Sequence, residues 1–318
     1  MKILIVRFSS IGDIVLTTPV VRCVKQQLKD AEVHFLTKEK FSGVVKHNPY
    51  IDRLHTMEED LSEVIPALKK ENYDYVIDLH HNVRTLKLKR TLGKTAFSFN
   101  KLNWEKFLIV NLKINRLPHQ HIVDRYFETV DSIGVKNDHK GLDYFIAEKD
   151  RVDITKLLPQ PFQSGYDVLV VGGSYFTKQI PLNKLLEISK NSLKPLVLLG
   201  GKEDKEIGDQ VAIAYEQKVM NLCGSLNLNQ SASVIEQSQK VISSDTGLMH
   251  IAAAYKKDII SIWGNTIPEF GMGPYMAGPG SKILEVKGLS CRPCSKLGYR
   301  KCPKGHFKCM NDIDVSVI

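Results

Sequence analysis

Short apolar segments alternate with amphipathic helical segments along the whole chain, and this alternation constrains the fold more than any other feature of the sequence. Buried parallel strands are short and apolar, and helices connect them, so the pattern predicts parallel sheets that are covered on both faces. Further elements are expected: a strand at 142–146, an amphipathic helix at 120–133 and the start of a helix at 311–318. The apolar segments include "KILIV" (2–6), "EVHFLT" (32–37), "YDYVIDLH" (73–80), "YDVLVVGG" (166–173), "KPLVLLGG" (194–201), "KVISS" (240–244) and "DIISIWG" (258–264).

Residues 151–165, with two prolines, a glycine and several polar residues, interrupt this alternation and are typical of a linker. The sequence therefore predicts an α/β protein with two doubly wound, Rossmann-like domains, 1–155 and 156–318, that face a cleft. Ligands of such domains bind at the carboxyl ends of the strands, so the loops that follow the strands should carry the chemistry. These loops are "SSIGD" (9–13), "HHNVR" (80–84), "GGSYFTKQIP" (172–181), "GGKED" (200–204) and "SSDTG" (243–247).

The formal net charge of +9 is concentrated in two stretches. Residues 84–116 hold nine Lys/Arg and one acidic residue, and residues 282–308 hold eight Lys/Arg and one acidic residue. Such clusters indicate a phosphate-rich partner (nucleic acid, an anionic membrane surface or a phosphorylated substrate), or else two solvated faces. Apolar runs stay shorter than the ~18 residues of a membrane span, and the chain begins in a strand without a signal-peptide pattern, which favours a cytoplasmic location.

Four of the six cysteines lie close together in the pattern C-x2-C-x7-C-x6-C. In a cytoplasmic chain such a cluster is more typical of a metal site than of disulfides, and its count suits a structural, tetrahedral zinc or iron site. Reduced thiols or one or two disulfides are the alternatives. The four residues are Cys291, Cys294, Cys302 and Cys309.

The loop "VISSDTGLMHIAAA" (241–254) is the most specific signal for a ligand. Thr246 and Gly247 would offer backbone N–H groups to an anion at the start of a helix. Asp245 is either a ligand contact or the helix N-cap, and His250 is either a site residue or a half-buried helix residue. Two other loops add Lys178, a cation or a solvated surface lysine, and Glu203, a ribose contact or an ordinary first-turn carboxylate.

Three motifs together resemble a known family. "RFSSIGDIVLTTP" near the start, "TKQIP" in mid-chain and "SSDTGLMHIAAA" followed by "WGNTIPE" are similar in order and spacing to the bacterial lipopolysaccharide heptosyltransferases of glycosyltransferase family 9. The resemblance covers nearly the whole chain. Two departures stand out: Asn265 occupies a position where proline is more usual, and "TKQIP" lacks the usual tryptophan before its proline.

The resemblance implies a GT-B fold and inverting, metal-independent transfer of heptose from ADP-heptose to a lipid-linked core sugar. It implies that Asp13 is the base and that Lys178 neutralises the leaving diphosphate. Asp13 as a helix cap or structural salt bridge is the alternative. A carboxylate in a closed, partly dry cleft is expected to have a raised pKa. On the donor side the expected residues are Ser10, Gly12, Thr177, Glu203, Asp245, Thr246, Gly247 and His250.

The basic stretch is expected to bind the anionic acceptor at the inner face of the cytoplasmic membrane. Trp104, Phe107 and Leu108 alternate there with Lys101 and Lys106, as in an interfacial segment, and a solvated helix with a packed apolar face is the alternative. Its acceptor-binding candidates are His81, Asn82, Arg84, Lys87 and Arg90. Two further interpretations remain open at this point: an epimerase or sensor that binds a nucleotide sugar, and a basic RNA-docking protein. No RNA-binding module is recognisable, and stacking aromatics are scarce in the basic stretches.

Overall fold

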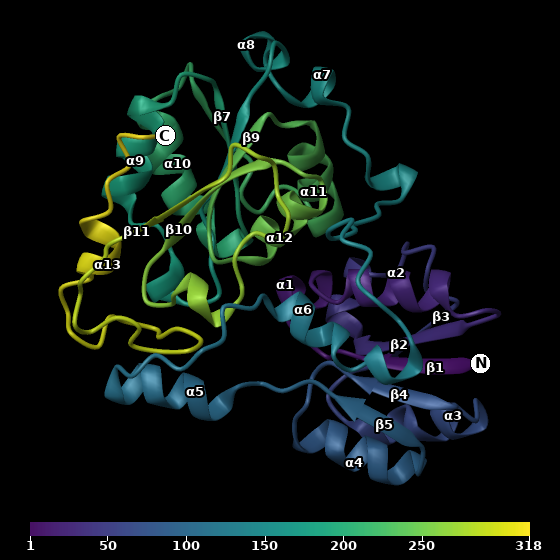
Figure 1. The fold of residues 1–318 in the computed structure, drawn as a ribbon. Coiled ribbons are helices and arrows are strands. Elements are labelled where there is room, and N and C mark those ends of the chain that lie inside the picture. Colours follow the sequence, from purple (N-terminus) through teal and green to yellow (C-terminus); the bar gives the residue numbers. More distant parts are fainter. The chain divides into compact units, whose positions relative to one another are not determined.

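The computed structural model describes residues 1–318 and divides into two compact units (Figure 1). The first unit comprises Met1–Leu102 and Gln120–Phe145, and the second comprises Asn103–His119 and Ile146–Ile318. The chain therefore passes to the second unit near residue 145, before the stretch 151–165 that we expected to be the linker. That stretch carries two short helices, α7 (Ile154–Leu157) and α8 (Gln160–Gln163).

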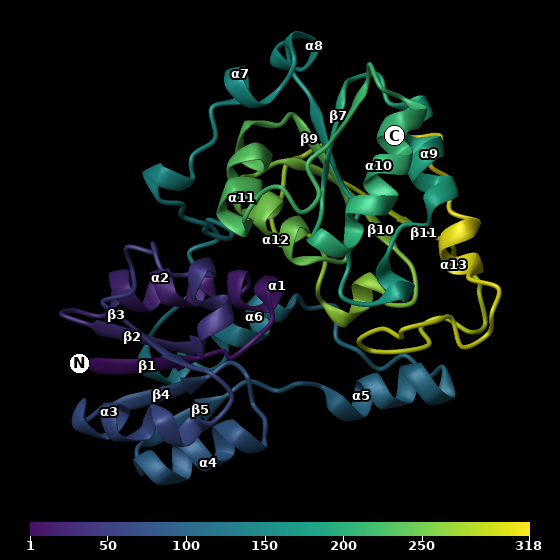
Figure 2. The ribbon, with the colours of Figure 1, turned by 180° about the vertical axis from the view of Figure 1, so that it is seen from behind.

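The first unit contains a five-stranded parallel sheet in the order β3-β2-β1-β4-β5. The helices α2 (Thr18–Gln27) and α6 (Ile122–Phe127) lie on one face, and α3 (Ile65–Lys70) and α4 (Val83–Leu92) lie on the other, as both ribbon views show (Figures 1 and 2). The inner strands β2, β1 and β4 follow from apolar runs that are mostly buried, whereas the edge strands β3 and β5 are only partly buried. The strands are β1 (Lys2–Val6), β2 (Glu32–Lys38), β3 (Arg53–Met57), β4 (Tyr75–Asp78) and β5 (Thr95–Ser98).

The second unit contains a six-stranded parallel sheet in the order β11-β10-β9-β6-β7-β8. Helices α9 (Leu182–Asn191) and α10 (Lys205–Ala214) cover one face, and α11 (Leu228–Gln237) and α12 (Gly247–Ala254) cover the other (Figures 1 and 2). The strands are β6 (Asp167–Val170), β7 (Leu196–Leu199), β8 (Val219–Asn221), β9 (Lys240–Ser244), β10 (Asp258–Trp263) and β11 (Lys282–Glu285).

Three sequence-based expectations about the elements were wrong. Residues 142–146 form no strand, because neither sheet contains a partner for them. The helix expected at 120–133 is shorter, since α6 ends at Phe127 and a separate 3₁₀ turn spans Asp131–Ile133. The C-terminal helix α13 (Lys308–Asn311) ends where we expected a helix to begin, and Ile313 and Val315 after it are buried in the core of the second unit.

Candidate functional site

In the first sheet the order in which the strands are added changes direction between β1 and β4. Strands β1 to β3 follow one another outward in one direction, whereas β4 and β5 follow in the other. Ligands of doubly wound sheets bind at the carboxyl edge beside such a switch point. The two loops that leave this point are residues 7–13 and 79–84, and we call them together the first site.

Asp13 lies in α1 (Ile11–Val15), the short helix that follows β1, and its two carboxylate oxygens have separate partners. Oδ1 is 2.5 Å from a guanidinium nitrogen of Arg7, and Oδ2 accepts hydrogen bonds from Ser10 N (3.1 Å) and Ser10 Oγ (2.7 Å). The Asp13 side chain is 24% exposed, so a ligand can reach it. Gly12 is buried in the same helix. Ser10 is therefore the N-cap of α1, and Asp13 is the third helical residue that accepts from the N-cap backbone, forms a salt bridge and stays partly exposed.

Arg7 is the residue of the first site that sequence reasoning missed. Its guanidinium is buried and donates to the carbonyl oxygens of Ser9 (2.8 Å) and Leu79 (2.5 Å), and it lies 3.1 Å from Tyr126 Oη. Arg7 therefore ties the loop after β1 to the loop after β4 and fixes the charge beside Asp13. The signal in the sequence was an arginine directly after a buried strand.

The loop after β4 contains two histidines with different surroundings. His80 packs on the ring of Phe8 with centroids 4.9 Å apart, and burial, together with the charges of Arg7 and Lys101, lowers the pKa of His80 to about 3. The side chain is consequently a neutral imidazole at neutral pH. His81, the residue expected in the site, has a φ of 48° and directs Nδ1 to Phe99 O at 2.7 Å, away from the switch point.

Of the remaining acceptor candidates, Asn82 caps α4, with its Oδ1 accepting from Thr85 N at 3.0 Å. Arg84 lies over the Phe8 ring at 5.5 Å from its centroid, and Lys87 and Arg90 are exposed. Between them, Lys89 is not available for a ligand. Its Nζ is 2.8 Å from Oδ2 of the fully buried Asp78, so this cation has a structural partner.

The second sheet has its own switch point, between β6 and β9. The second site comprises the loops 171–181 and 244–247 that follow these strands. Lys178 from the first loop and Asp245 from the second form an ion pair across the switch point, with Nζ and Oδ2 2.5 Å apart. Both side chains are mostly buried, at 17% and 11% exposed. Oδ2 of Asp245 also accepts a hydrogen bond from Thr266 Oγ1 at 3.2 Å, so the sequence motifs around 178, 245 and 266 meet at this point.

The N-cap of α12 is Thr246 and not Asp245. Thr246 Oγ1 accepts from Met249 N at 3.4 Å and is 2.9 Å from Ser243 Oγ. The carboxylate of Asp245 forms the ion pair with Lys178 instead. Gly247 is the first residue of α12, and His250 is buried within the helix.

Two other candidates are arranged differently from the expectation. Glu203 is exposed, whereas its neighbour Asp204 is buried and accepts from Gly201 N at 2.7 Å. Burial raises the pKa of Asp204. Thr177 is buried and exchanges hydrogen bonds with the backbone of Tyr299, so it fastens the cysteine-containing segment to the loop after β6.

Asn265 adds an unusual feature beside the second site. It is 1% exposed, and neither its amide nitrogen nor its amide oxygen has a hydrogen-bond partner. Buried polar groups without partners cost free energy, so such groups are concentrated where a ligand or a strained conformation has a use for them. Its neighbour Thr266 contacts Asp245, which places Asn265 next to the ion pair.

The four cysteines of the C-terminal segment are free thiols that share one neighbourhood. Burial raises the pKa of Cys309 to about 12, and the nearby thiols of Cys294, Cys302 and Cys291 add to this shift. Cys291 Sγ is 3.9 Å from Nε2 of His306. The sulfur atoms are grouped, but they do not form a set of three that converges within 4.8 Å.

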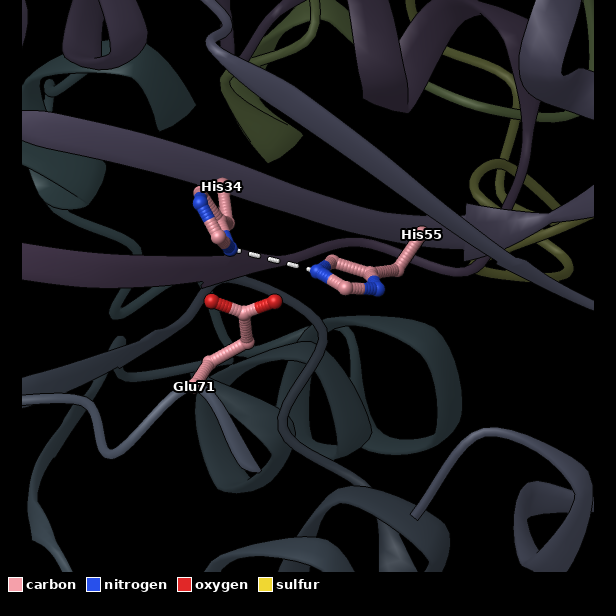
Figure 3. A group of neighbouring side chains, drawn as sticks. All are labelled: His34, His55 and Glu71. Atoms are coloured by element: carbon pink, nitrogen blue, oxygen red, sulfur yellow. Dashed lines mark hydrogen bonds between the residues drawn. The ribbon is translucent and has the colours of Figure 1, made fainter. Parts of the chain in front are cut away.

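Such convergence does occur in the first unit, among ligand atoms of His34, His55 and Glu71 (Figure 3). His34 Nδ1 is 3.2 Å from His55 Nε2, and Tyr73 Oη is within 3.1 Å of both rings. One hydroxyl and two imidazoles can satisfy one another in this triangle without an ion.

The carboxylate of this cluster is already neutralised. Glu71 Oε2 is 2.7 Å from Lys2 Nζ, and Oε1 contacts Arg53. Two cations beside the only anionic ligand would oppose a metal ion. The cluster also lies toward the amino ends of β1 and β2, at the edge of the sheet opposite Asp13. We therefore interpret it as a buried polar network that connects strands and not as a metal centre.

None of the helices has both the length and the apolar composition that spanning a bilayer requires.

Comparison with known proteins agrees with this geometry. The sequence profile of glycosyltransferase family 9 (heptosyltransferase) matches residues 62–300. The chain is 27% identical over 294 residues to lipopolysaccharide heptosyltransferase 1 of Campylobacter coli, covering 84% of each protein. Its fold is similar to that of the family 9 glycosyltransferase of Veillonella parvula (TM-score 0.73, 24% identity, 90% and 86% of the two chains). It is also similar to E. coli heptosyltransferase WaaC with ADP-2-deoxy-2-fluoro heptose (TM-score 0.68, 23% identity, 91% and 94%).

Two parallel α/β units, each with polar loops at its switch point, define the GT-B class of glycosyltransferases. Within that class the chain belongs to glycosyltransferase family 9, the heptosyltransferases. It is thus a glycosyltransferase of lipopolysaccharide biosynthesis, as its sequence motifs indicated.

Proposed function

We propose that the protein is an inverting, metal-independent heptosyltransferase that uses ADP-heptose and an anionic, lipid-linked core acceptor at the inner face of the cytoplasmic membrane. The first unit would bind the acceptor and the second the nucleotide sugar. The observation that carries the proposal is the environment of Asp13, a solvent-accessible carboxylate fixed on a strand–helix junction by Arg7 and Ser10.

In the proposed reaction Asp13 takes the proton of the acceptor hydroxyl while the acceptor oxygen bonds to the anomeric carbon. The bond from that carbon to the diphosphate oxygen breaks, and ADP leaves with the electron pair from the opposite face. Asp13 then releases its proton to water. The guanidinium of Arg7 lies 2.5 Å from Oδ1 of Asp13. Arg7 therefore holds the carboxylate of the proposed base in a fixed orientation.

The second site supplies positive potential for the leaving diphosphate. Lys178 and the backbone N–H groups at the start of α12 can meet the charge that grows in the transition state. In the absence of donor, Asp245 holds the Lys178 ammonium in place. With donor bound, Lys178 would be shared with phosphate, and Asp245 would gain a free lone pair for a sugar hydroxyl. A positioned lysine replaces the divalent ion that other transferases use for this charge.

We propose that the Asn265 amide forms hydrogen bonds with the nucleotide-sugar donor. Its amide has both a donor and an acceptor without a partner, and it adjoins the residue that contacts Asp245. A small movement of the loop on binding would satisfy both atoms. The acceptor, in turn, would be held by Arg84, Lys87 and Arg90 along α4, since cations there suit phosphates and acidic sugars.

A structural zinc or iron ion at the four cysteines is proposed as a separate feature without a catalytic role. Four thiols in one neighbourhood, with His306 beside Cys291, supply a suitable donor set, and small side-chain movements would bring the sulfur atoms together. Elemental analysis of protein purified without chelators should find about one metal ion per chain, and Cys294→Ser should lose it. Metal-free protein with four titratable thiols and wild-type stability would contradict this.

The function is tested by following ADP release from ADP-heptose with and without a lipid-linked core acceptor. Transfer is expected to need the acceptor and to proceed at the same initial rate in EDTA. Release of ADP that does not depend on any acceptor would indicate another activity of the same fold. Restoration of a lost rate by added magnesium would contradict metal independence.

A further inference from the structure

Residues 103–116, which we call the aromatic segment, expose large apolar side chains on the second unit. The segment consists of α5 (Asn103–Phe107), a π-helical turn (Leu108–Leu112) and the residues that follow. Large apolar side chains that are exposed together usually mark an interaction site. The exposed fractions are 64% for Trp104, 49% for Phe107, 57% for Leu112 and 45% for Ile114.

The way in which this segment is fastened explains why these side chains face outward. Leu108 and Ile109 are buried, at 7% and 6% exposed. Lys113 Nζ donates to the carbonyl oxygens of Pro293 (2.7 Å) and Cys291 (3.4 Å), and Lys106 Nζ lies 5.9 Å from the Phe270 ring centroid. The segment is thus held against the second unit by one buried apolar pair and two lysines.

The exposed aromatic pair is ordered as a unit. Trp104 and Phe107, three residues apart, project from the same side of α5 and stack with centroids 5.7 Å apart and planes at 12°. The sequence around the pair is basic: Lys101, Lys106, Lys113 and Arg116 lie within or beside the segment in sequence, and Glu105 is its only acidic residue. Tryptophan and phenylalanine rimmed by lysine and arginine are typical of surfaces that rest in the headgroup region of anionic bilayers.

We infer that the aromatic segment is the surface by which this enzyme docks on an anionic lipid bilayer. The inference rests on the proposed function, because an acceptor that is linked to lipid must be met at a membrane. Trp104 and Phe107 would enter the boundary between headgroups and acyl chains, and the exposed Arg116 at the end of the segment would contact lipid phosphates. A bilayer fits better than a second copy of the chain, because the apolar residues lie beside like charges that would repel their copies across a two-fold interface.

The chain offers an intrinsic probe of this contact. It has two tryptophans, and Trp263 is fully buried in β10, so a change in emission on adding vesicles reports on Trp104. With vesicles of phosphatidylglycerol and phosphatidylcholine at low salt, without any acceptor, we expect a blue shift and quenching by brominated lipid. Pure phosphatidylcholine or high salt should reduce binding by about tenfold or more.

The variant Trp104→Ser/Phe107→Ser should weaken vesicle binding about tenfold or more, because each ring loses much of its apolar burial. Both side chains are exposed, so circular dichroism should show an unchanged fold. Leu193→Ser/Ile213→Ser is the matched control: these residues of the same unit are 98% and 72% exposed, and binding should not change.

Three results would overturn the inference: no emission shift with anionic vesicles, equal losses in the control variant, or a dimer that the aromatic substitutions dissociate. Activity on a soluble, delipidated acceptor separates this inference from the proposed function. The aromatic variant should retain that activity. If the wild-type protein lacks it but binds vesicles, the proposed function fails and the docking surface stands.

Discussion

At the residue scale, the pair of Asp13 and Arg7 fixes the carboxylate that we propose as the catalytic base. We expect Asp13→Asn to lower turnover by about a hundredfold or more, because the amide keeps the shape of the side chain but cannot take the proton. Donor affinity should stay nearly unchanged, since Lys178 and Asp245, which we propose to bind the diphosphate and the sugar, lie in the second unit. Turnover with ADP-heptose and acceptor, and calorimetric binding of ADP, measure the two quantities.

Asp60→Asn is a suitable control, because this carboxylate is exposed and caps a turn in the same unit by accepting from Ser62 N at 2.9 Å. Its turnover should match the wild-type enzyme. Turnover of Asp13→Asn within a few fold of normal would remove Asp13 from the mechanism.

The residue scale is also where sequence reasoning reached its limit. Asp13, Lys178 and Asp245 were identifiable because motifs and strand-end loops mark them. The partners were not: Arg7 reaches Leu79, which lies 72 residues away, and Lys178 reaches Asp245, which lies 67 residues away. Those pairings depend on which strands become neighbours in the sheet, and a sequence motif does not show the strand order.

At the scale of the element, α4 carries two kinds of cation. Lys87 and Arg90 are exposed and can bind a ligand, whereas Lys89 pairs with the buried Asp78. We expect Lys87→Glu/Arg90→Glu to raise the KM for an anionic acceptor about tenfold or more, because two exposed positive charges become negative. The KM for the donor should remain the same. Initial rates at varied acceptor concentration, repeated at high salt, measure the effect, which screening should diminish.

Lys89→Glu in the same helix should behave differently. It would leave the buried Asp78 carboxylate without its cation and beside a like charge, which should lower the free energy of unfolding by roughly 3–5 kcal/mol. Urea denaturation distinguishes the two outcomes. If Lys89→Glu were as stable as the wild type and changed only the acceptor KM, the division of roles within α4 would be wrong.

The elements themselves were largely predictable, because buried strands leave continuous apolar runs. The exceptions have physical reasons. Strand β11 (Lys282–Glu285) lies at a sheet edge, where its side chains stay half-exposed and its apolar signal is weak. The apolar residues 142–146 resemble a strand but have no neighbour to pair with, so local composition alone could not exclude them.

At the scale of the whole molecule, buried histidines make stability depend on pH. Burial lowers the pKa of His80 to about 3, and burial beside His34 lowers that of His55 to about 4, against about 6.5 in an unfolded chain. Below pH 6.5 the unfolded chain therefore binds protons that the native protein does not. Each histidine should cost about 2 kcal/mol between pH 7 and 5.

A second loss should follow at lower pH. Although burial alone would raise the pKa of Asp138, its bonds to Arg22 lower it to about 2, so the stability that it supplies disappears as pH falls below about 3.8. Thermal unfolding from pH 7 to 3 should show both phases. His80→Phe should reduce the first by about half, because His55 remains, whereas replacing the exposed His119 by glutamine should not change it. A flat profile between pH 7 and 5 would contradict this account.

The organisation of the whole chain was predictable to a similar extent. Two parallel sheets, their order along the chain and the loops that carry polar residues follow from strand–helix alternation. Residues 103–119 belong to the second unit although the first unit precedes and follows them in sequence. This could not be predicted, because the segment belongs there through tertiary contacts such as those with Pro293 and Phe270.

Each of the two charge pairs lies within one unit: Arg7 with Asp13 in the first, Lys178 with Asp245 in the second. If the first unit binds the acceptor and the second the donor, as we propose, a mutation that alters the recognition of one substrate leaves the charge pair of the other unit intact. Lineages can acquire a new acceptor while inheriting the old donor, or the reverse, and chimeras that join the two units of different relatives are a practical route to new sugar linkages.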